Sequence, residues 1–322
     1  MSKLSRFVRP YRIERARGFR LKDIDPGDSA GIPSDRKEEA AALLADGVKR
    51  MAALQDKLYA QDRWSLLLIF QALDAAGKDS VIKHVLSGIN PQGCQIFSFK
   101  APSAQERDHD FMWRNMRTLP ERGRIGIFNR SYYEEVLIVR VHPNILAGEN
   151  LPDDITNKKD LWEHRYESIV EHEKHLRRNG TKVIKFFLHI SREEQAKRFI
   201  DRIDKPKKQW KFSEGDIHER EYWDDYMQAY SEAISATSTE HAPWYVIPAD
   251  DKKNVHLLVS TVVLETLRSF NLEFPELPAE ELAGLKVFRD QLIAESPGLK
   301  LDEASVDDGD DEPTSPDEVN GN

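Results

Sequence analysis

The sequence contains little cysteine, no long apolar run and no excess of positive charge. Its 322 residues include one cysteine, Cys94, which excludes an internal disulfide and favours a reducing compartment, so we expect a cytoplasmic protein. Mean hydropathy is −0.62 and no apolar run is long enough to cross a bilayer, so no membrane partner is expected. Residues 1–6 lack the apolar core of a secretory signal, and we expect no export.

The net charge of −9 comes from the end of the chain. Residues 301–322 contain nine acids and no Lys or Arg, and without these nine the 56 acidic residues become 47, equal to the 47 basic ones. The rest of the chain is therefore formally neutral and can hold a strongly positive site. The acidic segment is polar, with Gly, Pro and Ser, so we expect a disordered, solubilising tail from about residue 298.

Short apolar segments alternate with helical patterns along most of the chain. The run Trp64–Phe70 is continuously apolar, as expected for a parallel strand covered by helices on both faces. Further strands are predicted at 94–99, 125–128, 183–190 and 244–247. Helices are predicted at 36–61, 78–86, 104–118, the start of 131–141, 161–178, 193–203, from after 215 to about 235, and 255–270. This order predicts an α/β three-layer sandwich with a mostly parallel central sheet.

Three segments differ in composition. Residues 1–35 carry scattered charge and three prolines, and they are predicted to form an irregular N-terminal arm. Residues 36–272 contain the alternating pattern without a dividing linker, so we expect one domain. Residues 273–322 are expected to form a C-terminal extension.

The segment Asp74-Ala-Ala-Gly77-Lys78 lies between the buried strand and a predicted helix. In this position, backbone N–H groups and the helix N-terminus can face a phosphate, and a lysine can reach it. The predicted phosphate contacts are Ala75, Ala76, Gly77, Lys78, Asp79 and Ser80. The alternative is that Gly77 and Lys78 only begin a helix.

The loop differs at two positions from the usual G-x-x-x-x-G-K-[ST] pattern. Ala72 replaces the first glycine, and Asp79 stands where a Ser or Thr would hold Mg²⁺, with Ser80 as a partial substitute. Asp74 can supply the missing ligand, because Mg²⁺ prefers hard oxygen atoms.

Polar residues follow the predicted strand 125–128. Ligands of open α/β sheets bind beyond the carboxyl ends of the strands, where Asn129 and Arg130 lie. The forked guanidinium of Arg130 matches a phosphoryl group. Glu134 and Glu135 follow, where carboxylates can hold a metal or position an acceptor; alternatively, they belong to a solvated helix face.

A basic segment follows the predicted strand 183–190. It contains six cations and two aromatic residues: Arg198, Arg202, Lys205, Lys207, Lys208, Lys211, Trp210 and Phe212. Such a segment is suited to a lid over a polyanion. The alternatives are a solvated basic loop and a site for single-stranded nucleic acid. No RNA-binding signature accompanies it, so we expect no nucleic-acid partner.

Five segments occur in an order typical of one family. They are Ile69–Asp79, Gly88–Gly93, Phe128–Tyr133, Lys208–Ser213 and Ala242–Pro248. Each is modest alone, and the five in this order are specific. Over about residues 20–272 the chain therefore resembles the second family of polyphosphate kinases.

The resemblance implies a thymidylate-kinase-like P-loop fold, with a helical lid at about residues 202–235 over a tunnel for inorganic polyphosphate. It implies catalytic roles for Asp74, Lys78 and Arg130. Mg²⁺, or Mn²⁺ as the alternative, would be held by Asp74 and Glu135.

The remaining implied contacts lie on the lid and around the acceptor. Polyphosphate would be contacted from the lid by Arg202, Lys208 and Lys211. The acceptor nucleotide would be positioned by Arg114, Glu134 and Glu135. Many members of the family have aspartate where this chain has Asn129, and this chain is similar to the class III branch, which phosphorylates AMP and ADP. We also expect a homo-oligomer.

These observations predict a kinase that transfers the terminal phosphoryl group of polyphosphate to AMP or ADP. One alternative is a nucleoside monophosphate kinase with ATP as donor, which would share the fold and the loop. Another is a polyanion-binding protein without catalysis. Asp74 argues against the latter, because a carboxylate in an anion site is unfavourable unless a metal is bound.

Overall fold

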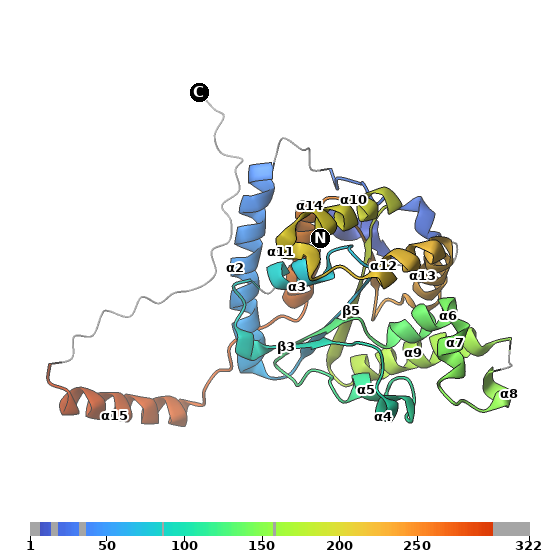
Figure 1. Ribbon diagram of the computed structural model, residues 1–322. Coiled ribbons are helices and arrows are strands. Elements are labelled where there is room, and N and C mark those ends of the chain that lie inside the picture. Colours follow the sequence, from blue (N-terminus) through green and yellow to red (C-terminus); the bar gives the residue numbers. More distant parts are fainter. Residues whose placement is uncertain (1–6, 14–18, 32–36, 86, 157–158, 299–322) are drawn as a thin grey trace. The chain divides into compact units, whose positions relative to one another are not determined.

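The computed structural model describes residues 7–13, 19–31, 37–85, 87–156 and 159–298 (Figure 1). The chain divides into two compact units, Met1–Glu273 and Phe274–Asn322. The first unit contains the sheet and the candidate site.

Within the described residues of the first unit, six strands form one sheet in the order β1-β6-β5-β2-β4-β3. Neighbouring strands are parallel except β1 and β6, which are antiparallel. The strands are β1 (Arg12–Ile13), β2 (Ser65–Ala72), β3 (Cys94–Ser98), β4 (Ile125–Asn129), β5 (Thr181–His189) and β6 (Trp244–Pro248). The predicted α/β fold with a mostly parallel sheet is confirmed.

Strand β2 lies inside the sheet and is buried on both faces. Leu66, Leu68 and Phe70 pack into one core, and Leu67 and Ile69 pack into the other. Successive side chains of a strand point to opposite faces, so two covered faces require a continuous apolar run.

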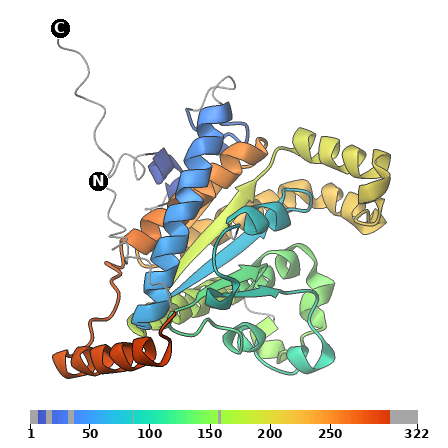
Figure 2. The same ribbon diagram turned by 90° about the vertical axis from the view of Figure 1, so that its left-hand side faces the viewer.

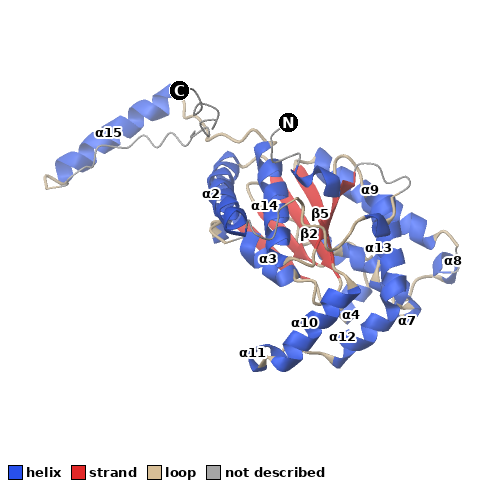
Figure 3. Cartoon of the chain, turned by 90° about the horizontal axis from the view of Figure 1, so that it is seen from above, coloured by secondary structure: helices blue, strands red, loops and turns tan. Residues whose placement is uncertain are grey.

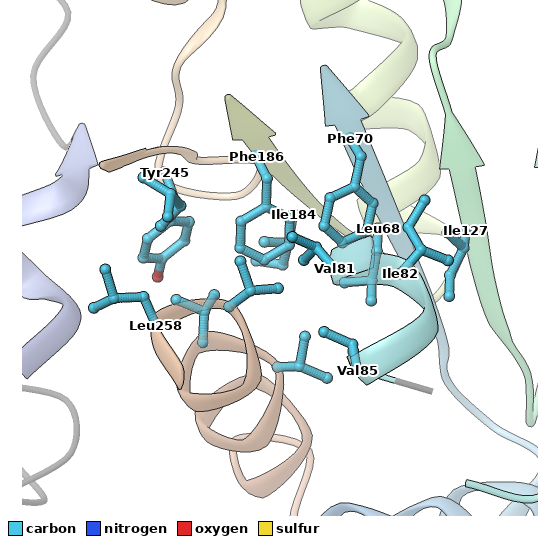
Figure 4. Packing of buried hydrophobic residues seen from close by; sticks show 14 of the residues in the cluster. Leu68, Phe70, Val81, Ile82, Val85, Ile127, Ile184, Phe186, Tyr245 and Leu258 are labelled. Carbon is cyan, nitrogen blue, oxygen red and sulfur yellow. The ribbon is translucent and has the colours of Figure 1, made fainter. Parts of the chain in front are cut away.

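Helices cover both faces of the sheet. One face packs against α2 (Lys37–Gln61), α3 (Lys78–Val85) and α14 (Lys252–Arg268). Figure 2 shows α2, in blue, beside α14, in orange. Figure 4 shows Val81, Ile82 and Val85 of α3 packed against this face. The other face carries α9 (Leu161–Arg178) and α13 (Trp223–Thr237) (Figure 3).

The prediction of a single helix at 104–118 is wrong. The structure has two short helices, α4 (Ala104–Arg107) and α5 (Trp113–Met116). The Asp110 side chain accepts a hydrogen bond from the Met112 N–H at 3.0 Å, which competes with helical hydrogen bonding and explains the break. The segment 131–141 holds a 3₁₀ helix, η4 (Tyr132–Val136), and then α6 (Ile138–Val141), followed by α7 (Pro143–Ala147) and α8 (Asp153–Thr156).

The described N-terminal residues are more ordered than the predicted irregular arm. The 3₁₀ helix η1 (Arg9–Tyr11) leads into β1, and η2 (Leu21–Asp23) follows. Tyr11, Ile13 and Leu21 are buried. A two-residue strand is too short to show an alternating pattern, so no periodicity predicts it.

The predicted lid, at about residues 202–235, begins at the end of α10 (Arg192–Asp204). Short helices follow: α11 (Pro206–Gln209), α12 (Glu214–His218) and the 3₁₀ helix η5 (Glu219–Tyr222). Helix α11 lies in the gap between the helices predicted at 193–203 and from after 215. Figure 3 shows α10, α11 and α12 projecting together from one end of the sheet. Helix α13 buries Tyr230 and Ile234, so this part of the predicted lid belongs to the helical layer on the sheet.

The second unit contains α15 (Ala279–Glu295), which the sequence analysis did not predict and which buries none of its residues. The predicted disorder from about residue 298 concerns residues 299–322, which lie outside the described residues. Of the helices in the described part of the chain, none is long and apolar enough to cross a membrane.

Candidate active site

The phosphate loop connects β2 to α3. Ala75 (φ +64°) and Gly77 (φ +106°) both have left-handed backbone conformations, which curl the chain tightly before α3 begins at Lys78. The Lys78 Nζ donates a hydrogen bond to the Ala72 carbonyl at 2.7 Å, so the ammonium lies at the carboxyl end of β2. Burial lowers the Lys78 pKa, and the neighbouring Asp74 carboxylate opposes this shift.

The carbonyl groups of the loop are held by α10. Arg198 donates hydrogen bonds to the carbonyls of Ala75 (3.2 Å) and Ala76 (2.8 Å), and Gln195 donates to the Asp74 carbonyl at 2.9 Å. Within a trans peptide unit the N–H points opposite to the C=O, so the N–H of Gly77 points away from α10. Arg198 is therefore bound to the loop backbone, and its predicted place among the cations of the lid is wrong.

A cavity of about 410 Å³, the phosphate pocket, lies where β2, β3 and β4 end beneath the lid. Its basic side chains are Lys78, Lys100, Arg130, Arg202 and Lys211, and its acidic ones are Asp74 and Asp79. Five cations against two carboxylates suit a polyanionic ligand. Lys100 was missed, although its place after a strand end is the signal that identified Arg130.

Among the predicted phosphate contacts, Ala75, Gly77, Asp79 and Ser80 also line this pocket. Ala76 is buried below it and does not line it.

Arg130 lies at the centre of the site with a left-handed backbone (φ +65°), and its N–H donates to the Phe70 carbonyl at 3.0 Å. Its guanidinium lies 3.3 Å from Asp74 Oδ1 and 3.9 Å from Glu134 Oε2. Glu134 also accepts a hydrogen bond from Gln71 at 3.0 Å. The carboxylates of Asp74 and Glu134 therefore fix the orientation of the Arg130 guanidinium.

Asn129 donates a hydrogen bond through Nδ2 to Asp79 Oδ1 at 2.9 Å. An aspartate at position 129 would bring two carboxylates together here, which is unfavourable without a cation between them. The amide and Asp79 thus form a matched pair beside the loop.

The acceptor pocket is a second cavity, of about 430 Å³, on the other side of Arg130. Its charged residues are Lys100, Arg107, Arg114, Arg130, Glu134, Glu135 and Glu149. The three predicted acceptor residues, Arg114, Glu134 and Glu135, therefore lie together and share this pocket with Arg130.

Glu135 is buried between two arginines. Its carboxylate lies 3.6 Å from Arg114 and 3.9 Å from Arg165, and Arg165 also contacts Glu149 at 2.5 Å. Burial and the charge of Glu149 raise the Glu135 pKa to about 7, against the opposing effect of the arginines.

Some of the lid cations are paired with lid acids. Arg202 lies 3.4 Å from Asp216, while Lys205 and Lys208 both contact Asp201. Arg202 lines the phosphate pocket, and Lys208 does not. Asp216 lines a smaller cavity of about 180 Å³, the lid pocket, together with Asp74, Arg130, Glu134, Gln195, Glu219 and Arg220. Neither lid acid, Asp201 or Asp216, was predicted from the sequence.

The carboxylates suit a weakly chelated cation. Within the described residues, no group of three or more His, Cys, Asp or Glu side chains could hold a metal. Mg²⁺ is usually bound by one or two carboxylates with phosphate oxygens and water, and the Asp74 side chain, 35% exposed, fits that role. Glu135, predicted as its co-ligand, is held instead by Arg114 and Arg165, and Glu134 is the carboxylate that shares Arg130 with Asp74.

A parallel sheet between helical layers, a phosphate loop after a central strand and a cationic pocket under a helical lid define a kinase of the P-loop type. The chain belongs to the polyphosphate kinase 2 family, because the family model "Polyphosphate kinase 2 (PPK2)" matches residues 34–275. This confirms the resemblance found in the sequence.

Individual relatives agree with this assignment. The chain is 58% identical over 259 residues to an ADP-polyphosphate phosphotransferase of Rhodopseudomonas palustris. The aligned region covers 80% of this chain and 90% of the relative. It is 41% identical over 269 residues to an AMP/ADP-polyphosphate phosphotransferase of Meiothermus ruber, covering 84% and 96%. The crystal structure of polyphosphate kinase 2 from Arthrobacter aurescens TC1 superimposes with a TM-score of 0.80 at 40% identity, covering 90% of this chain and 97% of that one.

Proposed function

We propose that this protein transfers the terminal phosphoryl group of inorganic polyphosphate to AMP and ADP, giving ADP and ATP. The observation that carries the proposal is the position of Arg130, which lines both the phosphate pocket and the acceptor pocket. A donor chain in the first pocket and a nucleotide phosphate in the second would meet at its guanidinium. The names of the relatives support both substrates.

The reaction requires positioning and charge neutralisation more than proton transfer, because the acceptor oxygen of a nucleotide phosphate is already anionic at pH 7. Lys78 and the loop N–H groups would hold the donor. Arg130 would stabilise the equatorial oxygens of the transferred phosphoryl group in the transition state. Arg202 and Lys211 would contact the rest of the polyphosphate. The partly exposed Asp74 would hold Mg²⁺, or Mn²⁺, which would supply further charge neutralisation.

We propose that both AMP and ADP are acceptors, as in the class III branch. Asn129 supports this, since it matches the sequence form of that branch. Its side-chain amide donates a hydrogen bond to Asp79 in this structure. We further propose a cytoplasmic location, supported by the single cysteine and the nucleotide substrates, and a homo-oligomer, which sedimentation analysis would test.

One assay separates this function from its alternatives. Purified protein is incubated with Mg²⁺, AMP and polyphosphate, and in parallel with Mg²⁺, AMP and ATP, and the nucleotides are quantified. Formation of ADP and then ATP in the first mixture is expected. Product in the second mixture alone would identify an ATP-dependent monophosphate kinase. Polyphosphate binding without product in either mixture would identify a non-catalytic binding protein.

A further inference from the structure

A fully buried ion pair lies behind the segment that carries Arg130. Glu173 of α9 and Lys185 of β5 both have 0% side-chain exposure, and Lys185 Nζ lies 2.5 Å from Glu173 Oε2. Neither residue lines the phosphate, acceptor or lid pocket, so neither can touch a substrate there.

Each polar atom of the pair has a partner. Lys185 Nζ also donates to the Thr237 carbonyl at 2.8 Å and to the Tyr133 hydroxyl at 3.0 Å. Glu173 Oε1 accepts hydrogen bonds from the hydroxyls of Tyr132 and Tyr133, both at 3.0 Å. The pair thus connects α9, β5 and the end of α13 to η4; α9 and α13 lie on the same side of the sheet (Figure 3).

Stability alone is a poor explanation for this arrangement. Removing two charges from water costs several kcal/mol per ion, and replacing a buried ion pair by apolar side chains is often neutral or stabilising. What the pair does specifically is to fix the hydroxyls of two consecutive buried tyrosines, which apolar side chains could not do.

The two tyrosines follow the turn between β4 and η4, and this turn carries Arg130. Arg130, two residues before Tyr132, has a left-handed backbone, which in a non-glycine residue persists only when the surroundings determine it. The Phe70 carbonyl fixes one side of this turn, and the tyrosine hydroxyls fix the other. Glu134, directly after the tyrosines, points to Gln71 and Arg130.

We propose that Glu173 is a positioning residue for phosphoryl transfer and that Lys185 balances its buried charge. The Glu173 side chain holds the η4 tyrosines and, through them, keeps Arg130 between the two pockets. The inference rests on the proposed function, because the reaction at Arg130 is what the pair would serve.

Two double variants test the proposal. Glu173→Leu/Lys185→Met removes the ion pair and the carboxylate acceptor, which leaves the Tyr132 hydroxyl without its acceptor and the Tyr133 hydroxyl with only Thr237 Oγ1 at 2.9 Å. The kcat should fall at least about tenfold, because small displacements of reacting groups are costly. Glu173→Gln/Lys185→Met also removes the ion pair but keeps an acceptor oxygen, and kcat should recover to within about threefold of the original protein. Equal kcat values in both variants, whether high or low, would overturn the proposal.

The matched control is Tyr11→Phe. It also removes a tyrosine hydroxyl that donates to a carboxylate, Asp28 at 2.9 Å, but in a part-buried position on the N-terminal segment. Its kcat should be unchanged at a temperature where all variants are folded. If the double variants do not fold, Tyr132→Phe replaces them, and a kcat equal to that of Tyr11→Phe would overturn the proposal.

Amide hydrogen exchange of residues 129–136 gives a readout that needs no turnover. Exchange should be faster in the Leu/Met variant and unchanged in Tyr11→Phe, because the turn loses its anchor only in the former. If the original protein shows no polyphosphate-dependent activity, the proposed function fails while this comparison still tests the positioning. Unchanged exchange in the Leu/Met variant would contradict it.

Discussion

The phosphate loop and the lid both present positive charge to the phosphate pocket, and they hold it by different means. On the loop, the Lys78 ammonium is bonded to the Ala72 carbonyl, and the loop carbonyls are bonded to the buried Arg198. On the lid, Arg202 is paired with the carboxylate of Asp216. A phosphate does not compete for the bonds that shape the loop, but it must replace a carboxylate on the lid.

This difference separates the expected effects. The loop is organised before the substrate arrives, so its residues should act mainly on kcat, since preorganised charge stabilises the transition state without reorganisation. On the lid, Arg202 must exchange a carboxylate for a phosphate, and Lys211 lies over the Trp210 ring, so their substitution should act mainly on the KM for polyphosphate.

The largest effect is expected for Lys78→Ala, which should lower kcat about 100- to 1,000-fold, the usual result of removing one preorganised donor. Asp74→Ala should have a similar effect, because it removes the proposed metal ligand. Steady-state kinetics with AMP and polyphosphate measure both.

The control is Lys83→Ala, on the exposed side of the same helix, which should leave kcat unchanged. Near-normal activity of Lys78→Ala would mean that the loop is not the phosphate site, and the comparison with the lid would lose its basis.

The acceptor pocket contains a buried acid, Glu135, whose protonation should change the stability of the protein. Glu135 keeps its proton up to a pKa of about 7 in the folded protein, whereas an unfolded chain releases it near the ordinary value of 4.5. The free energy of unfolding should therefore decrease as pH rises from about 4.5 to 7, by at most about 3 kcal/mol from this group. Glu135→Gln should flatten that slope in chemical denaturation at several pH values.

Glu121→Gln is the control for this slope, because Glu121 is 71% exposed and pairs with Arg124 only at 3.9 Å. It should leave the pH dependence unchanged. An equal slope in the original protein and in Glu135→Gln would show that the arginines keep Glu135 ionised throughout.

The fold was predictable where the signal is local. The apolar run Trp64–Phe70 identified β2, because a strand covered on both faces must be apolar at every position. The break between α4 and α5 could not be predicted, because it depends on one hydrogen bond of the Asp110 side chain. Strand β1 could not be predicted either, because a two-residue strand has no local pattern and forms only by pairing with the distant β6.

The site was predictable to the same extent. Lys78 and Arg130 directly follow strands, so the topology alone brings them together. Arg198 looks like any other cation of its basic segment, and Glu173 like any other acid of its charged helix. Their roles depend on partners far along the chain, which no local pattern reveals.

On the lid, Lys211→Ala should raise the KM for polyphosphate about tenfold, the usual cost of one charge-assisted contact. Lys208→Ala should raise it less than about threefold, because this lysine lies outside the phosphate pocket and is paired with Asp201. The two variants carry the same charge change, so non-specific electrostatics predict equal effects. Equal KM values would therefore show that the lid acts only through its net charge.

The smallest effect, and the one of opposite sign, is expected for Asp216→Asn. Asp216 holds Arg202 and faces Asp74 in the lid pocket, and burial with the Asp74 charge raises its pKa. Removing this carboxylate frees Arg202 for a phosphate, so the KM for polyphosphate should fall about threefold with kcat unchanged. Initial rates at varied polyphosphate concentration measure this.

Asp201→Asn is the matched control, because it removes an equal charge from the same lid. The partners of Asp201 are Lys205 and Lys208, and neither lines the phosphate pocket, so its substitution should not lower KM. If both variants lower KM equally, lid acids act by general repulsion. If Asp216→Asn lowers kcat instead, the carboxylate holds a cation during the reaction, and the lid, like the loop, contributes groups that are needed in the transition state.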